Sequence, residues 1–493
     1  MSEPTHDSAS TQRSIAWPLG LIAIVALLLR VLEACESSLW LDELHTLSHA
    51  SQPTLAAVIE HVRAEFHTPL FFVFVHWIGG FELGAWLRAI PIVSSVAMLW
   101  PMAAVARECG LSQRATLWMA WFYACLPYQI LYGTELRPYA WIGVFSVFAF
   151  LLAFSERRSM LVRLAAFFAS VLLGLLTHRI MALVLLSLGI ARLFSKRPRS
   201  VPLVGLIVAG TLAVAGFLPW LIGFAKKATD LRFEYQEHNG GYELRMTLVN
   251  ELVALPTRLI SPFTRELGSP WWIVMLVSSL LFALAALAVL VFAWRGRRSR
   301  EAAPVLRGLM IFAVAQFVIT SVFSVWTWDR VPLQYYTPMA WVIPLLLAAC
   351  IDRAANLRPV LIALGLASFL MGVALVGGKS REDMRGGIAA VRTLAAEART
   401  KSGLEPIYSA LLAQPQQFEN TLPYRAYARD LKPVEPDHIP QAGDSGFQRP
   451  LIVLCRNIAE KDKAMLSMSA TRTKVREIKI DRYLTAYWFA PQP

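Results

Sequence analysis

The chain contains a succession of apolar runs, most of them close to the length that a helix needs to cross a lipid bilayer. Such a helix requires about 20 apolar residues, because the bilayer core offers no water to hydrogen-bond the backbone. Of the 493 residues, 56% are hydrophobic and only 16% are charged, whereas about a quarter are charged in soluble domains. These runs therefore predict an all-α polytopic membrane domain.

The charged loops between the runs predict how the helices are oriented. Cytoplasmic loops carry an excess of Lys and Arg. The run at 68–81 is too short for a crossing and is interpreted as interfacial, which puts the N-terminus and the basic loops in the cytoplasm. We then expect about eleven crossings, at 15–33, 86–106, 112–132, 138–155, 160–177, 179–195, 201–222, 270–294, 304–325, 333–351 and 357–377.

Three polar segments accompany the crossings. Residues 1–14 are polar and predict a disordered cytoplasmic tail. In the periplasmic loop 34–81, apolar residues fall at helical spacing over 55–62, which indicates a helix lying in the interface plane. The loop 223–269 is long enough to be either a lid over a binding site or an inert cap.

After the membrane domain, 15–378, the composition becomes that of a soluble protein. Residues 383–400 have the apolar periodicity of a helix. Short apolar runs bounded by polar residues indicate strands, and they lie at 405–411, 450–455 and 483–490. We therefore expect residues 379–493 to form a small periplasmic α/β domain.

The net charge of +13 does not indicate a nucleic-acid partner, because the basic residues lie in short loops and no nucleic-acid motif is present. In such loops they set orientation and face anionic membrane lipids. The five cysteines are scattered, without metal-ligand spacing, so neither a disulfide framework nor a Cys-based metal site is expected.

Two adjacent carboxylates, Asp42 and Glu43, follow the first crossing. An acid beside a membrane is costly unless it is solvated, paired or used, and most such acids are simply solvated. Adjacent carboxylates suit chemistry in which one accepts a proton and the other serves structure or substrate. We take Asp42 as the candidate general base.

Three arginines begin or end crossings on the same predicted face as these acids. They are Arg88, Arg137 and Arg179. Arginine binds phosphate through a fork of hydrogen bonds and remains charged near lipid, so these side chains suit a phosphorylated lipid substrate. The alternative for each is an anchor to a lipid headgroup.

Five motifs, in this order, resemble the GT-C glycosyltransferases of the protein mannosyltransferase and aminoarabinose transferase type. The motifs are Arg30, Trp40-Leu41-Asp42-Glu43, His67-Thr68-Pro69-Leu70, Leu87-Arg88 and Glu135-Leu136-Arg137-Pro138-Tyr139. They span residues 20–155. The long outer loop and outer C-terminal domain match in layout, and Asp383-Met384-Arg385-Gly386 resembles the start of that domain in bacterial members.

The resemblance implies transfer of a sugar from a polyprenyl-phosphate carrier to an acceptor, usually with inversion, at the periplasmic face of a bacterial inner membrane. It implies catalytic roles for Asp42 and for Glu135 as a second acid. The expected site residues are Asp42, Glu43 and Glu135 for catalysis, Arg88, Arg137, Arg179 and Arg330 for the donor phosphate, and His67, Tyr139 and Tyr336 for substrate.

The chain departs from the family pattern in two places. His67-Thr68-Pro69 replaces the commoner His-Pro-Pro, and Gln334 stands where the family often has Arg, with Arg330 four residues earlier as the candidate replacement. Whether a divalent metal ion binds at Asp42 and His67 stays open, since no tight ligand spacing is present.

Two other function classes compete with this interpretation. A flippase or transporter of lipid-linked sugars would use the same arginines, but the internal repeats common in transporters are not recognisable in the sequence. A polysaccharide polymerase or ligase would need a polymeric donor. The sequence leaves open the sugar and whether the acceptor is a lipid, a glycan or a protein.

Overall fold

The computed structural model describes residues 7–65, 67–156, 159–195, 201–239, 271–295, 304–328, 333–353, 357–378, 383–411, 422–428, 430–434, 438–440, 444, 447–456, 471–480 and 484–491. Its contacts divide the chain into two compact units. The helical unit comprises Met1–Ala34, Ala56–Phe74 and Arg88–Gly378, and the sheet unit comprises Cys35–Leu55, Val75–Leu87 and Lys379–Pro493. Two stretches near the N-terminus, Cys35–Leu55 and Val75–Leu87, thus group with the C-terminal residues.

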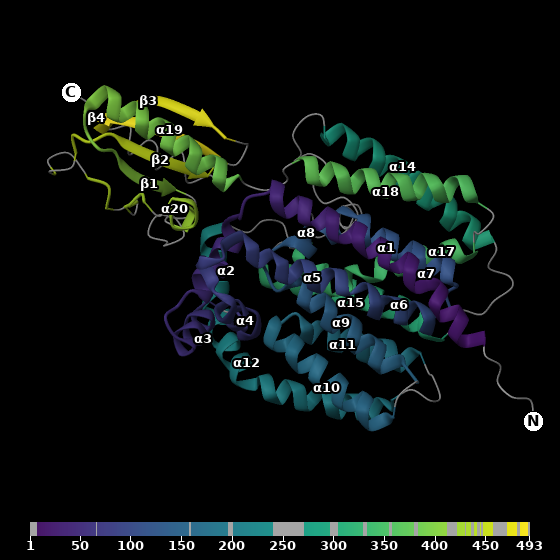
Figure 1. Cartoon of the computed structure of the whole chain (residues 1–493). Coiled ribbons are helices and arrows are strands. Elements are labelled where there is room, and N and C mark those ends of the chain that lie inside the picture. Colours follow the sequence, from purple (N-terminus) through teal and green to yellow (C-terminus); the bar gives the residue numbers. More distant parts are fainter. Residues whose placement is uncertain are drawn as a thin grey trace, which may run out of the picture. The chain divides into compact units, whose positions relative to one another are not determined.

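The helical unit is built from helices that differ widely in length (Figure 1). They are α1 (Asp7–Glu36), α3 (Leu55–Ala64), most of α4 (Pro69–Ile78), α5 (Ala89–Ala97), α6 (Leu99–Glu108), α7 (Gln113–Cys125), α8 (Pro127–Thr134), α9 (Tyr139–Phe154), α10 (Met160–Thr177), α11 (Met181–Phe194), α12 (Leu203–Asn239), α14 (Trp271–Arg295), α15 (Pro304–Trp328), the 3-10 turn η4 (Leu333–Tyr336), α16 (Thr337–Ala340), α17 (Val342–Arg353) and α18 (Arg358–Gly378).

The chain is a multi-pass membrane protein. Among the described residues, six helices are long and apolar enough to cross a bilayer, and the number rises to eight if two bent helix pairs each count as one span. The six are Ile15–Glu36, Gly84–Glu108, Met160–Thr177, Leu203–Trp220, Pro304–Ser324 and Arg358–Gly378. Orientation across the membrane stays a prediction.

The expected crossings correspond to helices, but not all of them are continuous spans. The crossing expected at 112–132 is interrupted at Leu126, where the backbone is extended. The chain then forms α8, which is bent by 113° against α9. α11 is shorter than a full span. Apolar composition alone does not reveal these interruptions, because Pro127 lies within an apolar stretch.

Arg30 of α1 occupies the break between α7 and α8. Pro127 has no N–H to donate to the carbonyl of Tyr123, four residues earlier. The Arg30 guanidinium takes this place, with Nη2 donating to the Tyr123 carbonyl and Nη1 to the Ala124 carbonyl, both at 3.2 Å. A positive charge is favoured at this end of α7, because the terminal carbonyls carry partial negative charge.

The remaining Arg30 donors are also satisfied. Nε donates to Ser95 Oγ at 2.8 Å, and the other two N–H groups reach the carbonyls of Ala26 and Gln129, each at 3.1 Å. All five N–H groups of the guanidinium are thus used by neutral acceptors on α1, α5, α7 and α8. The contact connects four helices through one side chain.

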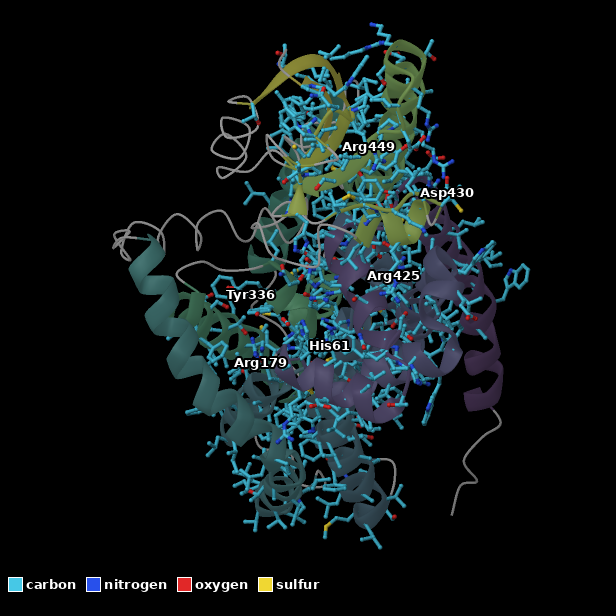
Figure 2. All side chains as sticks on the ribbon, turned by 90° about the vertical axis from the view of Figure 1, so that its left-hand side faces the viewer. His61, Arg179, Tyr336, Arg425, Asp430 and Arg449 are labelled. Carbon is cyan, nitrogen blue, oxygen red and sulfur yellow. The ribbon has the colours of Figure 1, made fainter. Side chains whose placement is uncertain are left out.

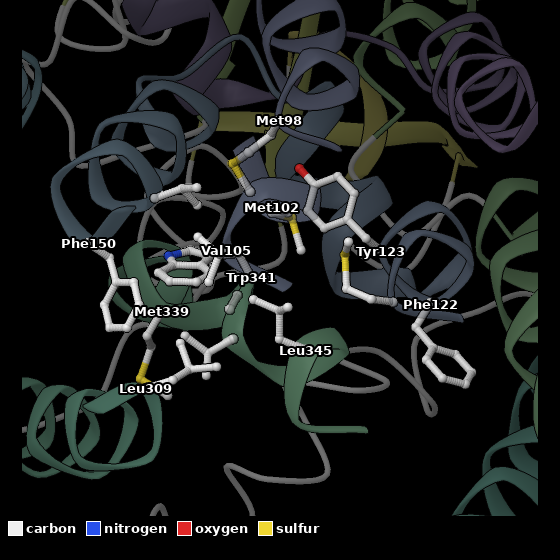
Figure 3. Packing of buried hydrophobic residues seen from close by; sticks show 14 of the residues in the cluster. Met98, Met102, Val105, Phe122, Tyr123, Phe150, Leu309, Met339, Trp341 and Leu345 are labelled. Atoms are coloured by element: carbon white, nitrogen blue, oxygen red, sulfur yellow. The ribbon is translucent and has the colours of Figure 1, made fainter. Parts of the chain in front are cut away.

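The core of the helical unit is continuous through α1, α6–α12 and α14–α18. Figure 3 shows part of it, where Trp341 lies among Met98, Phe150 and Leu309. The indole Nε1 of Trp341 donates to the Pro338 carbonyl at 2.6 Å, so this large buried ring leaves no polar group unsatisfied.

The sheet unit contains a four-stranded sheet in the order β1-β2-β4-β3. β1 (Ile407–Leu411) is parallel to β2 (Leu451–Arg456), while β4 (Leu484–Pro491) is antiparallel to both β2 and β3 (Arg472–Lys479). α19 (Met384–Ser402) packs on β2 and β4 (Figure 1). β3 was not predicted, because its charged residues outnumber Val475 and Ile478.

The sheet unit also holds α2 (Leu41–Ala50), the turns η1 (Gly80–Glu82) and η2 (Gly84–Arg88), and α20 (Leu422–Tyr427). Ser38 Oγ accepts a hydrogen bond from the Met384 N–H at 2.8 Å, and the Leu39 N–H donates to the Tyr427 hydroxyl at 2.7 Å. The segment before α2 is therefore bonded directly to α19 and α20.

Other expected elements have matching counterparts. The strands expected at 405–411, 450–455 and 483–490 coincide with β1, β2 and β4, and the helix expected over 55–62 coincides with α3. α1 begins at Asp7, within the segment expected to be a disordered tail. Residues 240–270 of the expected lid or cap lie outside the described residues, whereas 223–239 continue α12.

Gly133 provides a test of the Arg30 contact. A Cβ at this position would lie 2.4 Å from Ser95 Oγ and 2.8 Å from Arg30 Nε. We expect Gly133→Ala to break the Arg30–Ser95 hydrogen bond and to lower the free energy of unfolding by about 1–3 kcal/mol. The measurement is the thermal unfolding midpoint of the full chain in detergent.

Gly189→Ala is the matched control, because Gly189 is also helical and a Cβ there meets nothing within 4 Å. Both substitutions raise helix propensity by the same amount. Equal unfolding midpoints for the two variants would contradict the role assigned to Gly133.

Candidate active-site residues

The two adjacent acids of the sheet unit have different surroundings on α2. Glu43 is fully buried, and its Oε2 accepts a hydrogen bond from the Trp40 N–H at 3.2 Å. A carboxylate in this position satisfies a backbone donor that the helix start leaves open. Asp42 is only partly buried, in the first turn of the same helix. Glu43 therefore holds the start of α2, and Asp42 is the more accessible carboxylate.

In the helical unit, Glu135 and Arg137 lie in the turn that separates α8 from α9. Both side chains are buried, with 2% and 9% of their surface exposed. The Arg137 N–H donates to the Glu135 carbonyl at 2.6 Å, and Pro138 precedes the first residue of α9. The helices on both sides are buried, so the turn has little freedom to move.

His178 lies in the turn between α10 and α11, directly before Arg179. Its Nδ1 accepts a hydrogen bond from the Ile180 N–H at 3.2 Å. Since a backbone N–H can only donate, Nδ1 carries no proton, and the proton of the neutral ring is on Nε2. Within the part of the chain that the structure describes, Nε2 makes no hydrogen bond of its own.

Electrostatics keep this ring neutral. Burial, reinforced by the positive charges of Arg179 and Arg137, lowers the pKa of His178 to about 3. The three side chains, here called the cationic turn cluster, therefore offer two guanidinium ions and one uncharged N–H donor at neutral pH. Such a group of donors suits an anion with several oxygen atoms.

Aromatic rings surround His178. Its ring centroid lies 6.2 Å from that of Tyr139 and 5.8 Å from that of Tyr335. Tyr336, by contrast, is fully buried, and its hydroxyl shares a 2.7 Å hydrogen bond with Ser321 Oγ on α15. Figure 2 labels Arg179 and Tyr336 on the helical unit. Tyr335, rather than Tyr336, is the tyrosine beside the cationic turn cluster.

The other predicted residues make contacts elsewhere. Arg88 is buried, and its Nη1 donates to the Ala34 carbonyl near the end of α1 at 3.1 Å. The His67 ring lies 5.3 Å from Phe72. Arg330 lies outside the described residues. Among the residues that the structure does describe, no three His, Cys, Asp or Glu side chains gather closely enough to hold a metal ion.

The structure thus brings Arg137, Arg179 and Tyr139 together around His178. Asp42 and Glu43 belong to the sheet unit, and their roles stay predictions. Neither His178 nor Tyr335 is among the site residues that were predicted from the sequence. The adjacent His178-Arg179 pair at a helix end was the available signal, but the tautomer of His178 depends on a backbone contact that spacing does not reveal.

The helices, the bent α8–α9 pair and the small mixed sheet make up a fold that is similar to the fold of solved structures of ArnT and of an oligosaccharyltransferase. It is the fold that the resemblance in the sequence motifs implied. No family model and no curated protein sequence matches the chain. The similarity is visible in the structure.

Three solved structures illustrate it. ArnT (aminoarabinose transferase) from Cupriavidus metallidurans bound to undecaprenyl phosphate has a TM-score of 0.57 at 13% identity, over 95% of this chain and 97% of that one. Its apo form has a TM-score of 0.54 at 14% identity, over 97% and 98%. The oligosaccharyltransferase AglB from Archaeoglobus fulgidus, with an inhibitory peptide and a dolichol-phosphate, has a TM-score of 0.50 at 13% identity, over 98% and 74%. At these identities the likeness concerns the fold.

The neutral state of His178 is testable by titration. We expect its imidazole to stay unprotonated down to about pH 4, far below the ordinary histidine pKa of about 6.5, because of burial and the two neighbouring cations. Arg137→Gln removes one positive charge and should raise the His178 pKa. The measurement is NMR of ¹⁵N-histidine-labelled protein in detergent, with His178→Gln to assign the signal.

Arg307→Gln is the control, since Arg307 is an exposed arginine near the start of α15. It should leave the His178 signal unchanged. A His178 ring that titrates near pH 6.5 in the unaltered protein would refute the assignment.

Proposed function

We propose that this chain is a glycosyltransferase that moves a monosaccharide from a polyprenyl-phosphate carrier to an acceptor hydroxyl. The carrier is of the undecaprenyl type, and the reaction takes place at the periplasmic face of a bacterial inner membrane. The proposal is supported by the fold and by the sequence motifs. The observation that carries it is the cationic turn cluster, in which the charges of Arg137 and Arg179 act on a neutral His178 ring in the turns between helices.

The chemistry assigned to the cationic turn cluster is stabilisation of the departing phosphate. When the bond between the anomeric carbon and the phosphate oxygen breaks, the oxygen keeps the electron pair and gains charge. Arg137 and Arg179 neutralise that charge, and the Nε2–H of His178 donates to a phosphate oxygen. Donors that are fixed before the reaction need no reorganisation when the charge develops, which is the main source of electrostatic catalysis.

Asp42 is assigned the role of general base. The acceptor hydroxyl attacks the anomeric carbon in line with the leaving phosphate, and Asp42 takes the hydroxyl proton. One in-line displacement inverts the configuration at that carbon. The partial exposure of Asp42 suits a carboxylate that meets an acceptor, whereas the buried Glu43 supports its helix. Glu135 is assigned as the second acid.

The remaining predicted residues receive supporting roles. Tyr139 lines the cationic turn cluster and is proposed to contact the donor. Arg88, Tyr336 and His67 are proposed to act mainly through packing, since Arg88 bonds the end of α1 and Tyr336 bonds α15. Arg330 stays a candidate phosphate ligand on sequence grounds.

Replacement of the base tests the reaction. We expect Asp42→Asn to lower the rate of sugar transfer by roughly 10²–10⁴-fold without weakening carrier binding, because only proton transfer is lost. The measurement uses the full chain in liposomes with a polyprenyl-phosphate-linked sugar and a crude lipid and glycan acceptor fraction. Asp430→Asn is the control, since Asp430 forms an exposed ion pair with Arg392.

The same liposomes separate the alternatives. Movement of the labelled headgroup across the bilayer without its appearance on an acceptor would indicate a transporter. Consumption of monosaccharide donor with a single added sugar would exclude a polymerase. Unchanged transfer by Asp42→Asn would remove Asp42 from the mechanism.

A second test addresses the phosphate. We expect Arg137→Gln and His178→Phe to weaken binding of polyprenyl phosphate about tenfold or more, because each removes one hydrogen bond to a charged group. His178→Gln keeps an N–H donor and should retain more affinity than His178→Phe. The measurement is equilibrium binding of polyprenyl phosphate to the full chain in detergent, with Arg307→Gln as the control.

A further inference from the structure

A groove of about 520 Å³ lies on the helical unit between α7 and α18. Its lining includes Arg114, Trp118, Trp121, Ile362, Gly365 and Leu366. Apart from the one guanidinium, these side chains are almost entirely apolar. None of them belongs to the candidate active-site residues.

The walls of the groove are fixed. The Trp118 ring stacks on the Phe122 ring with 5.6 Å between centroids, and the Trp121 ring stacks on the Phe369 ring with 6.0 Å between centroids. The Trp121 indole also donates to the Gly365 carbonyl at 3.0 Å. A Cβ on Gly365 would lie 2.7 Å from the Trp118 ring, so glycine is needed for this packing. The groove therefore exists before a ligand binds.

The groove has a charged end. Gly365 lies beside Trp118 and Trp121, and Gly372, further along α18, lies beside the Cys125 carbonyl at the end of α7. The two helices therefore run parallel, and their first turns lie at the same end of the groove. Arg114 in the first turn of α7 and Arg358 at the start of α18 both belong to this end.

Other charged residues also lie near this end. Arg107 and Glu108 end α6, shortly before α7 begins. Asp352, at the end of α17, accepts hydrogen bonds from the N–H and the hydroxyl of Ser112, the residue that caps α7. Asp352 is thus engaged in the helix cap.

The open side of the groove belongs to a membrane span. Ile362 and Leu366 are 66% and 56% exposed, and both lie on α18, whose mean hydropathy over its span is 2.5. Apolar side chains on such a span contact lipid acyl chains. An occupant must therefore be apolar along the groove and anionic at its arginine end.

We propose that the groove is a binding site for an anionic phospholipid. One acyl chain lies along Trp118 and Trp121, and Arg114, supported by Arg358, binds the phosphate of the headgroup. Basic positions between membrane helices are typical binding sites for anionic headgroups. The proposal does not depend on the proposed glycosyltransferase activity, because it involves none of the residues assigned to that reaction.

Native mass spectrometry of the full chain in detergent tests this site. We expect phosphatidylglycerol to bind more tightly than phosphatidylcholine with identical acyl chains. Arg114→Gln should weaken phosphatidylglycerol binding about fivefold, the usual contribution of one basic residue near an anionic lipid surface, and should leave phosphatidylcholine unchanged. Arg307→Gln, at an exposed arginine that does not line the groove, should change neither.

A second variant tests the apolar part. Leu366→Trp fills the groove and should weaken the binding of both lipids. Val204→Trp is its control, because Val204 is 71% exposed on α12 and does not line the groove. Both sites are exposed to lipid, so neither variant disturbs the core.

Any of three comparisons with the control lipid or variants could overturn the proposal, and so could a competition experiment with phosphate. The contrary results of the comparisons are equal affinity for the two lipids, equal effects of Arg114→Gln and Arg307→Gln, and equal effects of Leu366→Trp and Val204→Trp. Displacement of phosphatidylglycerol by excess inorganic phosphate would show that the arginine end binds free phosphate, and would likewise overturn a lipid site. Persistence of the bound lipid in phosphate supports the lipid as the source of the anion.

Discussion

The helical unit depends on the contact between Arg30 and the broken end of α7. A buried guanidinium is costly in a membrane unless every donor is satisfied, and here five neutral acceptors satisfy it. The carbonyls at the end of α7, which the break at Pro127 leaves without helical partners, accept hydrogen bonds from Arg30. The cost of the buried charge and the cost of the broken helix thus offset each other. The turn with Glu135 and Arg137 follows directly, so its position derives from this contact.

The cationic turn cluster, proposed above as a phosphate site, combines two charged donors with a neutral one. Two guanidinium ions close together repel each other, and a third cation would add to that repulsion and to the desolvation cost. His178 supplies a donor without a charge, because its Nδ1 is occupied by the Ile180 N–H and its ring stays neutral. The same backbone hydrogen bond that starts α11 therefore determines which ring nitrogen faces a ligand.

Much of the fold was predictable from apolar length and periodicity, which locate most helices and three of the four strands. What sequence patterns missed were features that depend on single contacts. In the sequence, Pro127 is one residue of an apolar run. The structure shows that the helix breaks there and that Arg30 donates to a carbonyl just before the break. Tyr335 and Tyr336 are adjacent in sequence, yet only one lies beside His178. The motifs predicted residue types, while their partners required three-dimensional structure.

The attachment of α2 to the C-terminal elements has a consequence for the order of synthesis. The hydrogen bonds that hold the segment before Asp42 come from Met384 and Tyr427, which leave the ribosome hundreds of residues later. Chains are made from the N-terminus, and early segments wait for late partners when contacts are this distant. The helix that carries Asp42 therefore gains these supports only after the membrane helices are complete, so a truncated chain lacks them.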